Sequence, residues 1–444
     1  MTNGVLKRLI RGVTANSYGY FITMGMQLVN IPVYLYFWGV DFYGEWLVLT
    51  AIPAYLLLTE AGLISAAANK MVMLYKDGDG DVEKTRVVFH SAWGMVGIIS
   101  FFILFVILLL LAVHFYCFEW GFESISSVDG YLAFLCMCLY MILGLNVAVI
   151  NAGYRCVGMY SEGVFLANHI RVFEWLVTIG VLFFGGGALL VGFAFLASRM
   201  VGLIFMYMSY LKVVPDLKLG VGGFSKKEVG ELLGPALSFM GFPLGNAINN
   251  QGIVLILGIM LSPSSVVVFS AYRTLTRMLV QIVTVVNQSA WPEMTKAYGI
   301  GDFSLLRLLY IKVWRVAVFF SVLGVLGMMS LGEYLLDFWL GKEVGYNQWL
   351  FLLLVFSVGV NNVWQSGQVV LMAVSKHKEL SRFYVLMSVL YLLISMLGIF
   401  IFGVEGAGGA LFVYEMILCF WVFIKINDFL GVGLSCYLGF EKGN

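Results

Sequence analysis

Residues 264–290 read SSVVVFSAYRTLTRMLVQIVTVVNQSA, a stretch without acidic residues that is long enough to cross a lipid bilayer as one helix. Its polar side chains recur every three or four residues, at Ser270, Arg273, Arg277, Gln281, Thr284 and Gln288. On a helix of 3.6 residues per turn this spacing places them all on one face. Because a central arginine costs about 2.5–3.5 kcal/mol to insert, the face predicts a polar environment inside the membrane.

Similar apolar segments occur along the whole chain, which is 61% hydrophobic and only 11% charged. This composition excludes a water-soluble globular protein. The sequence therefore predicts an all-α polytopic membrane protein with twelve transmembrane helices. The predicted spans are 15–38, 44–68, 87–113, 131–153, 169–187, 190–213, 235–259, 264–290, 311–332, 347–374, 383–402 and 406–426.

Charge alternates between the gaps that separate these spans. All but four of the 26 lysines and arginines lie in every second gap, and the intervening gaps are acidic. Short basic loops stay in the cytoplasm, so both termini are predicted to be cytoplasmic. The four exceptions are Arg199, Arg273, Arg277 and Lys342.

The longest basic gap suggests how the chain is divided. Residues 215–234 form a cytoplasmic linker that contains Ser225-Lys-Lys-Glu-Val-Gly-Glu-Leu-Leu, with a serine N-cap and one apolar side, which predicts an amphipathic surface helix. The linker separates an N-terminal lobe, residues 1–214 with spans 1–6, from a C-terminal lobe, residues 235–444 with spans 7–12. This count depends on Gly185-Gly186-Gly187 being a turn between the fifth and sixth spans.

Three further spans carry polar residues at helical spacing. They are Asn16, Tyr20, Thr23, Gln27, Asn30 and Tyr34 in the first span, Asn246, Asn249, Asn250 and Gln251 in the seventh, and Asn361, Gln365 and Gln368 in the tenth. Such faces suit a water-filled cleft through the bilayer. The alternative is that these side chains bond one helix to another, as is common in membrane bundles.

Charged side chains inside the spans are candidates for function. A carboxylate in a low-dielectric environment can hold a proton near neutral pH, so Glu60 and Glu415 are candidate cation-coupling groups. The alternative is that they are structural partners of Arg199 or Arg273. The six cysteines and four histidines show no metal-ligand spacing, and we expect neither a metal, a cofactor nor a catalytic residue.

Three segments resemble the polysaccharide-transporter family and, within it, the Wzx-type O-antigen flippases: Gly44–Leu63, Ala271–Arg277 and Trp291–Tyr298. This family belongs to the multidrug/oligosaccharidyl-lipid/polysaccharide exporter superfamily. The resemblance implies a MATE-like exporter fold, in which two six-helix lobes form a V and spans 1, 2, 7 and 8 line the cleft.

The resemblance also implies a function. Its members flip undecaprenyl-diphosphate-linked oligosaccharide from the cytoplasmic to the periplasmic leaflet of the bacterial inner membrane by alternating access, with H⁺ or Na⁺ coupling as a family-level expectation. The implied partners are this substrate, the bilayer and the polysaccharide polymerase and chain-length machinery, with no nucleic acid, and we expect a monomer. Arg273, Arg277 and Arg199 would then meet the diphosphate, and the sugars would meet Gln281, Gln27, Asn30, Asn246 and Asn250.

Three rival functions stay open. A multidrug and toxin exporter of the same superfamily takes mostly cationic compounds and tends to need an acidic cavity. An O-antigen polymerase or ligase would need a long external loop with catalytic residues, which the predicted spans leave no room for. A passive scaffold would not need the polar stripes.

Overall fold

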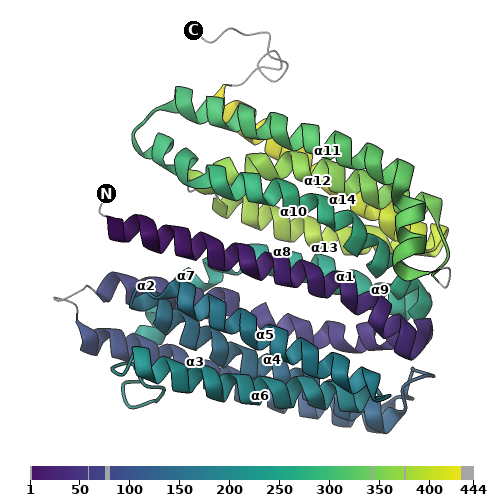
Figure 1. Cartoon of the computed structure of the whole chain (residues 1–444), viewed down its shortest axis with the longest axis horizontal. Helices are drawn as coiled ribbons and strands as arrows, with labels where there is room; N and C mark the ends of the chain where they lie inside the picture. Colours follow the sequence, from purple (N-terminus) through teal and green to yellow (C-terminus); the bar gives the residue numbers. More distant parts are fainter. Residues whose placement is uncertain (1–2, 59, 76–80, 342–343, 375–376, 432–444) are drawn as a thin grey trace. The chain divides into compact units, whose positions relative to one another are not determined.

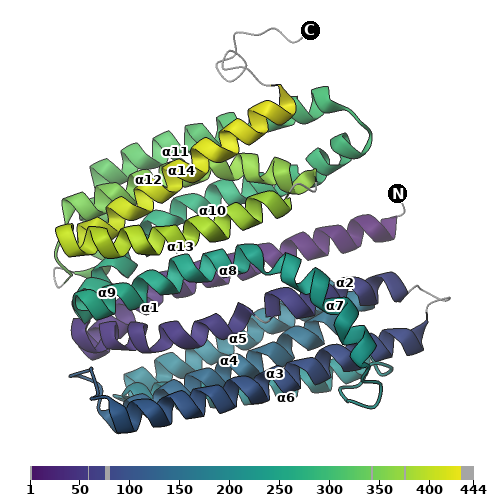
Figure 2. The same cartoon turned by 180° about the vertical axis from the view of Figure 1, so that it is seen from behind.

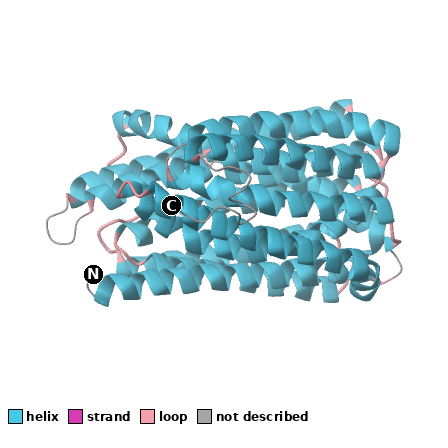
Figure 3. Ribbon diagram, turned by 90° about the horizontal axis from the view of Figure 1, so that it is seen from above, coloured by secondary structure: helices cyan, strands magenta, loops and turns pink. Residues whose placement is uncertain are grey.

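The computed structural model describes residues 3–58, 60–75, 81–341, 344–374 and 377–431 (Figure 1). Within these ranges the regular structure is helical and no strand occurs, as Figure 3 shows. The prediction of an all-α fold is confirmed. The chain divides into two compact units, an N-terminal unit Met1–Pro243 and a C-terminal unit Leu244–Asn444, and each is described by itself.

Nine helices of the described ranges are long and apolar enough to cross a membrane. Eight of these spans coincide with α3 (Val82–Cys117), α4 (Ser127–Cys156), α5 (Tyr160–Phe183), α6 (Ala188–Val213), α10 (Pro263–Gly299), α11 (Phe303–Leu340), α12 (Gln348–Ala373) and α14 (Val404–Leu430), and the ninth lies in α13 (His377–Phe402). These nine cover the third to sixth and eighth to twelfth predicted spans. The chain is therefore a multi-pass membrane protein.

The other three predicted spans fall on interrupted helices. The first two lie on α1 (Asn3–Ala54), η1 (Tyr55–Leu57), η2 (Glu60–Ile64) and α2 (Ser65–Leu74), and the seventh on α7 (Lys226–Phe239), α8 (Gly241–Ala247), η3 (Ile248–Gly252) and α9 (Ile253–Met260). The break inside α1 is at Gly39, whose φ of 72° suits glycine, and not at Pro32. Both η2 and η3 are wide π-helical turns.

The glycine turn between the fifth and sixth spans is confirmed. Helix α5 ends at Phe183, Gly185 adopts a φ of 74°, and α6 begins at Ala188. Because only a residue without a Cβ adopts this conformation at low cost, the chain reverses here instead of continuing as one helix.

Helices α1 and α5 run side by side in the same direction within the N-terminal unit. Four hydrogen bonds join α1 to α5 and to the turn that follows it, and residue numbers increase along both segments from one bond to the next. The bonds run from Tyr160 to Asn16 at 3.1 Å, from Arg171 to Thr23 at 3.1 Å, from Trp175 to Asn30 at 2.6 Å and from Trp38 to the carbonyl of Gly186 at 2.9 Å. Successive spans alternate in direction, so the first and fifth spans, which have three spans between them, must run in the same direction. The pairing therefore agrees with the predicted alternation of spans.

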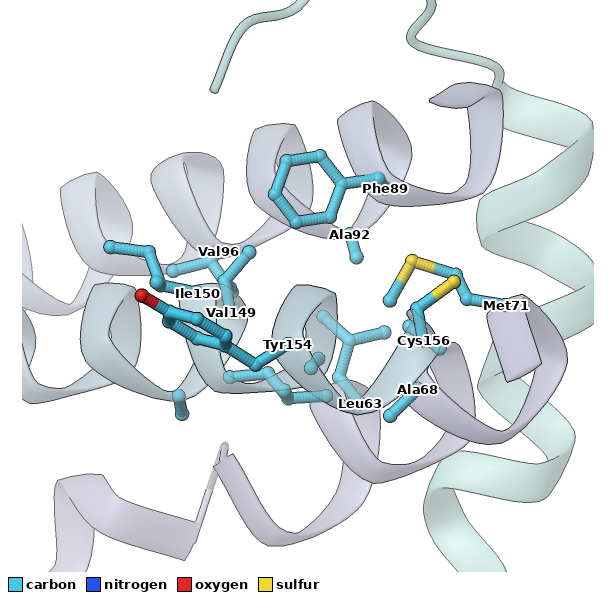
Figure 4. Close-up of a cluster of buried hydrophobic side chains, with 14 of the residues drawn as sticks. Leu63, Ala68, Met71, Phe89, Ala92, Val96, Val149, Ile150, Tyr154 and Cys156 are labelled. Carbon is cyan, nitrogen blue, oxygen red and sulfur yellow. The ribbon is translucent and has the colours of Figure 1, made fainter. Parts of the chain in front are cut away.

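The core of the N-terminal unit lies among η2, α2, α3 and α4. Figure 4 shows Leu63, Met71, Phe89 and Tyr154 in this core, each at most 5% exposed. Helix α7 packs on η2, α2 and α3 (Figure 2), so the predicted linker belongs to this unit. Its predicted serine N-cap is confirmed, because the Ser225 hydroxyl accepts from the backbone of Glu228.

Ionic and polar contacts fasten α7 to the unit. Lys70 of α2 donates to Glu228 at 2.5 Å and to Glu231 at 2.7 Å. The hydrogen bond from Lys70 lowers the pKa of the Glu231 carboxyl below its ordinary value. The chain just before α7 is held as well, because the Gly223 N–H donates to His90 at 2.9 Å.

The C-terminal unit is a bundle of α10 to α14 together with α9 and η3. Helices α13 and α14 approach closely: a Cβ on Gly406 would stand 2.0 Å from the carbonyl oxygen of Gly398. Glycine is therefore required at this crossing.

Candidate functional site

The two arginines of α10 meet a single amide in the C-terminal unit. Arg273 donates to the Asn250 Oδ1 atom at 2.7 Å, and Arg277 donates to the same oxygen at 2.7 Å. Arg273 also donates to the backbone carbonyl of Asn249 at 3.2 Å. The structure therefore brings together three of the polar residues that the sequence placed on the seventh and eighth spans.

The wide turn η3 positions this amide. A π-helical turn inserts one residue into the helix and weakens the regular ladder of backbone bonds, which leaves the carbonyl of Asn249 available to Arg273. The buried Asn249 side chain donates to the Tyr414 hydroxyl at 2.7 Å, which fixes the turn against α14. Neighbouring residues of η3 thus serve separate tasks, one anchoring the turn and the other holding both arginines.

The arginine pair makes no direct ion pair within the described part of the chain. Among the described residues, no carboxylate lies within the 4 Å of an ion pair from Arg273 or Arg277. Their hydrogen-bond partners are neutral oxygens, so no direct ion pair neutralises either charge, and the Glu415 carboxyl acts on both arginines only from beyond ion-pair distance. Arg277 is exposed and Arg273 is half-buried, with its guanidinium 5.8 Å from the centre of the Phe269 ring. The pair is therefore charged and accessible.

The nearest embedded carboxylate is held by other groups. Glu415 of α14 is 7% exposed and accepts hydrogen bonds from Trp364 at 2.7 Å and from Asn361 at 3.0 Å, both on α12. The Asn361 oxygen in turn accepts from Gln365 at 2.7 Å. Part of the predicted stripe on the tenth span therefore serves to hold Glu415.

The other C-terminal candidates lie around this centre. Asn246 is exposed and accepts a hydrogen bond from Tyr384 at 2.9 Å. Gln281, one turn beyond Arg277 on α10, is half-buried. Gln281 thus shares α10 with the arginine pair, and Asn246 lies on α8, which leads directly into the turn η3 that carries Asn250.

Arg199 has a different environment, in the N-terminal unit. Its guanidinium donates to both oxygens of Glu174, at 2.5 and 2.9 Å, and to the Tyr140 hydroxyl, and it lies 4.1 Å from the centre of the Tyr140 ring. Glu174 is 1% exposed. The charge of Arg199 is therefore neutralised, so this arginine has a structural partner. The partner is Glu174 and not Glu60 or Glu415, the two carboxylates that the sequence suggested.

The polar stripe of α1 is largely a helix-to-helix contact. Asn30 accepts from Trp175, and Asn16 and Thr23 bond to α5 as described above. Tyr34 is buried and stacks on Tyr43. Gln27, by contrast, is exposed. Of the two candidate residues on this stripe, Asn30 therefore bridges two helices, whereas Gln27 is exposed.

Comparison with known proteins bears on the fold. No family model matches the chain, and no curated protein matches its sequence. Among solved structures, the chain is similar to the lipid II flippase MurJ in an inward closed conformation, with a TM-score of 0.73 and 12% identity over 97% of this chain and 94% of that one.

An inward-facing multidrug resistance MATE family transporter of the MOP superfamily gives a TM-score of 0.71, with 13% identity over 91% of this chain and 94% of that one. The chain has the MATE-like fold. A MOP superfamily transporter from Pyrococcus furiosus, described as having a binding pocket of reversed polarity, gives a TM-score of 0.59, with 14% identity over 96% of this chain and 95% of that one.

Arg171 lies deeper in its helix than the sequence suggests. The sequence places it at the cytoplasmic start of the fifth span, predicted at 169, but α5 begins at Tyr160. Arg171 therefore lies near the middle of the helix, one turn from Glu174. Treating the less apolar residues 160–168 as helical places both residues at this depth. The Glu60 side chain lies outside the described residues.

Proposed function

We propose that this MATE-like protein is a flippase, which moves an undecaprenyl-diphosphate-linked oligosaccharide from the cytoplasmic to the outer leaflet of a bacterial inner membrane by alternating access. The observation that carries the proposal is the accessible arginine pair of α10. Arg273 and Arg277 share one neutral oxygen and meet no carboxylate among the described residues. A diphosphate would supply the missing negative charge.

The energetics of the pair support an anionic ligand. Two uncompensated arginines inside a membrane cost about 5–7 kcal/mol on insertion scales, a cost that a phosphate or water must offset. Planar guanidinium groups also bind phosphate oxygens in a bidentate manner. We assign the diphosphate to Arg273 and Arg277 and exclude Arg199, whose donors already meet Glu174.

The sugar portion needs hydrogen-bonding groups, because each unpaired hydroxyl is costly in hydrocarbon. We assign this role to Asn250, Asn246 and Gln281 near the arginines and to Gln27 on α1, with Asn30 as a less accessible candidate. The lipid tail would stay in the bilayer, and no covalent step is required. The similar lipid II flippase supports transport of a lipid-linked substrate on this fold.

The membrane potential can drive the export. Moving two negative charges outward across 100 mV, negative inside, is favourable by about 4–5 kcal/mol. Glu415 is the proposed cation-coupling group, with Glu60 as the second candidate, and both termini are proposed to be cytoplasmic. A polysaccharide polymerase and its chain-length partner would act on the exported product.

Deletion and complementation test the proposal. In a strain that lacks this gene, the wild-type protein should restore surface glycan, whereas Arg273→Gln and Arg277→Gln should each reduce it by about tenfold or more at equal protein level. Arg155→Gln is the matched control, because this exposed arginine at the end of α4 also bonds to one amide oxygen, that of Asn69 at 2.9 Å. Full surface glycan in both α10 variants would contradict the proposal.

A multidrug exporter is the second candidate. It is favoured by the similar multidrug resistance transporter and by the embedded carboxylate of Glu415. The two functions differ in whether the protein makes dye-sensitive cells resistant. Resistance to cationic dyes that depends on Glu415 and not on the arginine pair would favour drug export.

A further inference from the structure

Arg171 is an embedded arginine of the N-terminal unit that has no carboxylate partner among the described residues. Its one hydrogen bond in the described structure goes to the Thr23 hydroxyl at 3.1 Å, and its side chain is exposed. The nearby Glu174 already pairs with Arg199. Of these three charged residues, Arg171 therefore keeps an uncompensated positive charge.

The position of Arg171 on α5 argues against contact with lipid tails. It lies on a stripe with Asn168, Glu174 and Thr178, which are all buried. The exposed apolar residues Phe173, Leu176 and Phe183, between 43% and 69% exposed, lie on the opposite face at helical spacing. The guanidinium therefore emerges at the edge of the packed face and not on the apolar one.

On α1, too, the polar residues that face α5 and the exposed apolar residues lie on different sides of the helix. Thr23 and Gln27 lie one turn apart on the polar stripe, and Gln27 is exposed. The exposed apolar residues of this helix, Phe21, Val29 and Tyr36, lie on its other side. A guanidinium, a hydroxyl and a free amide thus line one polar strip between two parallel helices.

We propose that Arg171 and Gln27 form a second anion-binding subsite, which takes the carboxylate or phosphate of an acidic sugar. Thr23 positions the guanidinium, because its hydroxyl accepts from Arg171 and donates its own proton to the carbonyl of Gly19 at 2.8 Å. The proposal rests on the proposed transport of a glycan and adds a preference for acidic sugar units. Within the described residues the bond to Thr23 uses one of the five guanidinium N–H donors of Arg171, and the other four can make a bidentate contact with an oxyanion. Gln27 would donate to the same group or to an adjacent hydroxyl.

The rival explanation is that Arg171 merely bonds α5 to α1. A structural role would lower the melting temperature without changing ligand binding, whereas a binding role would change affinity for anions alone. Gln27→Ala separates the two independently of Arg171, because Gln27 has no hydrogen-bond partner within the described structure.

Titration of the full-length protein in lipid nanodiscs tests the subsite. The probes are glucuronic acid, for a sugar carboxylate, and glucose 1-phosphate, for a sugar phosphate, with neutral glucose as the control ligand. At least one acidic sugar should bind the wild type more tightly than glucose does. Arg171→Gln should weaken that binding by about tenfold and Gln27→Ala by about threefold, whereas Arg155→Gln should not change it.

Several results would overturn the subsite. They are equal affinities of the wild type for acidic and neutral sugars, unchanged acidic-sugar affinity in Arg171→Gln and in Gln27→Ala, or a lowered melting temperature as the sole effect. The probe that responds distinguishes a carboxylate from a phosphate ligand. Pyrophosphate in the same nanodiscs reports on Arg273 and Arg277, so failure of the proposed flippase site is seen separately from failure of this subsite.

Discussion

Arg199 and Arg273 are both arginines inside membrane-crossing helices, but the two units of the protein satisfy them differently. In the N-terminal unit, Glu174 and Tyr140 surround the Arg199 guanidinium and neutralise it. In the C-terminal unit, Arg273 shares the Asn250 oxygen with Arg277 and has no counter-ion among the described residues. The comparison is the reason why we propose a binding site at Arg273, which forms no ion pair within the described structure, and not at Arg199, which pairs with Glu174.

The largest expected change in stability comes from breaking the buried ion pair between Arg199 and Glu174. Glu174→Gln leaves the Arg199 charge uncompensated in a buried site, which should lower the free energy of unfolding by about 3–5 kcal/mol. Thermal or chemical unfolding of the purified protein measures it.

The control is Glu162→Gln in the same unit. Glu162 pairs with Arg11 at 3.8 Å with both side chains exposed, so its loss should cost less than about 1 kcal/mol. Equal stabilities of the Glu174 and Glu162 variants would show that Arg199 is not held by the buried pair.

An intermediate effect is expected at Glu415, which is hydrogen-bonded like Glu174 but unpaired. In Glu415→Gln the amide oxygen still accepts from Trp364 and Asn361, so stability should change by less than about 1.5 kcal/mol. Because an amide does not exchange a proton, transport should lose its dependence on an imposed proton gradient.

Glu405→Gln is the matched control, since Glu405 also accepts from an asparagine, Asn347, but at the start of α14. Gradient-dependent transport that is equal in the wild type and in Glu415→Gln would assign Glu415 a structural role.

The smallest effect is expected at the exposed contact of α7. Because Lys70 lowers the pKa of Glu231, the contact is fully present above the ordinary carboxyl pKa and is lost as the pH falls through the lowered value. The protection of α7 amides against exchange, corrected for the intrinsic exchange rate at each pH, should therefore fall modestly on acidification below about pH 4.

Glu231→Gln should remove part of this pH dependence at α7 while leaving exchange in α4 unchanged. A pH profile of α7 exchange that is identical in the variant would contradict the assigned contact.

The sequence predicts the elements that follow from hydropathy and helical spacing. The apolar windows locate nine helices of the described ranges, and the three- and four-residue spacing brings Arg273 and Arg277 onto one face of α10. The glycine turn at 185–187 follows from the conformational freedom of glycine alone.

What the sequence does not predict depends on tertiary contacts. The π-helical turn that places Asn250 beneath both arginines has no local signal, because its register is decided by packing on α14. The pairing of Glu174 with Arg199 depends on how α5 packs against α6, which the positions of the two spans do not specify. Nor does a polar stripe distinguish a bond to another helix, as at Asn30, from an open side chain, as at Gln27.

Flipping of a lipid-linked oligosaccharide in proteoliposomes tests the central claim most directly. We expect the wild type and Arg155→Gln to flip the diphosphate-linked substrate at similar rates. The double variant Arg273→Gln and Arg277→Gln should be at least tenfold slower but no less stable, because it removes charge that no carboxylate balances among the described residues. Flipping by the double variant at the wild-type rate would contradict the account.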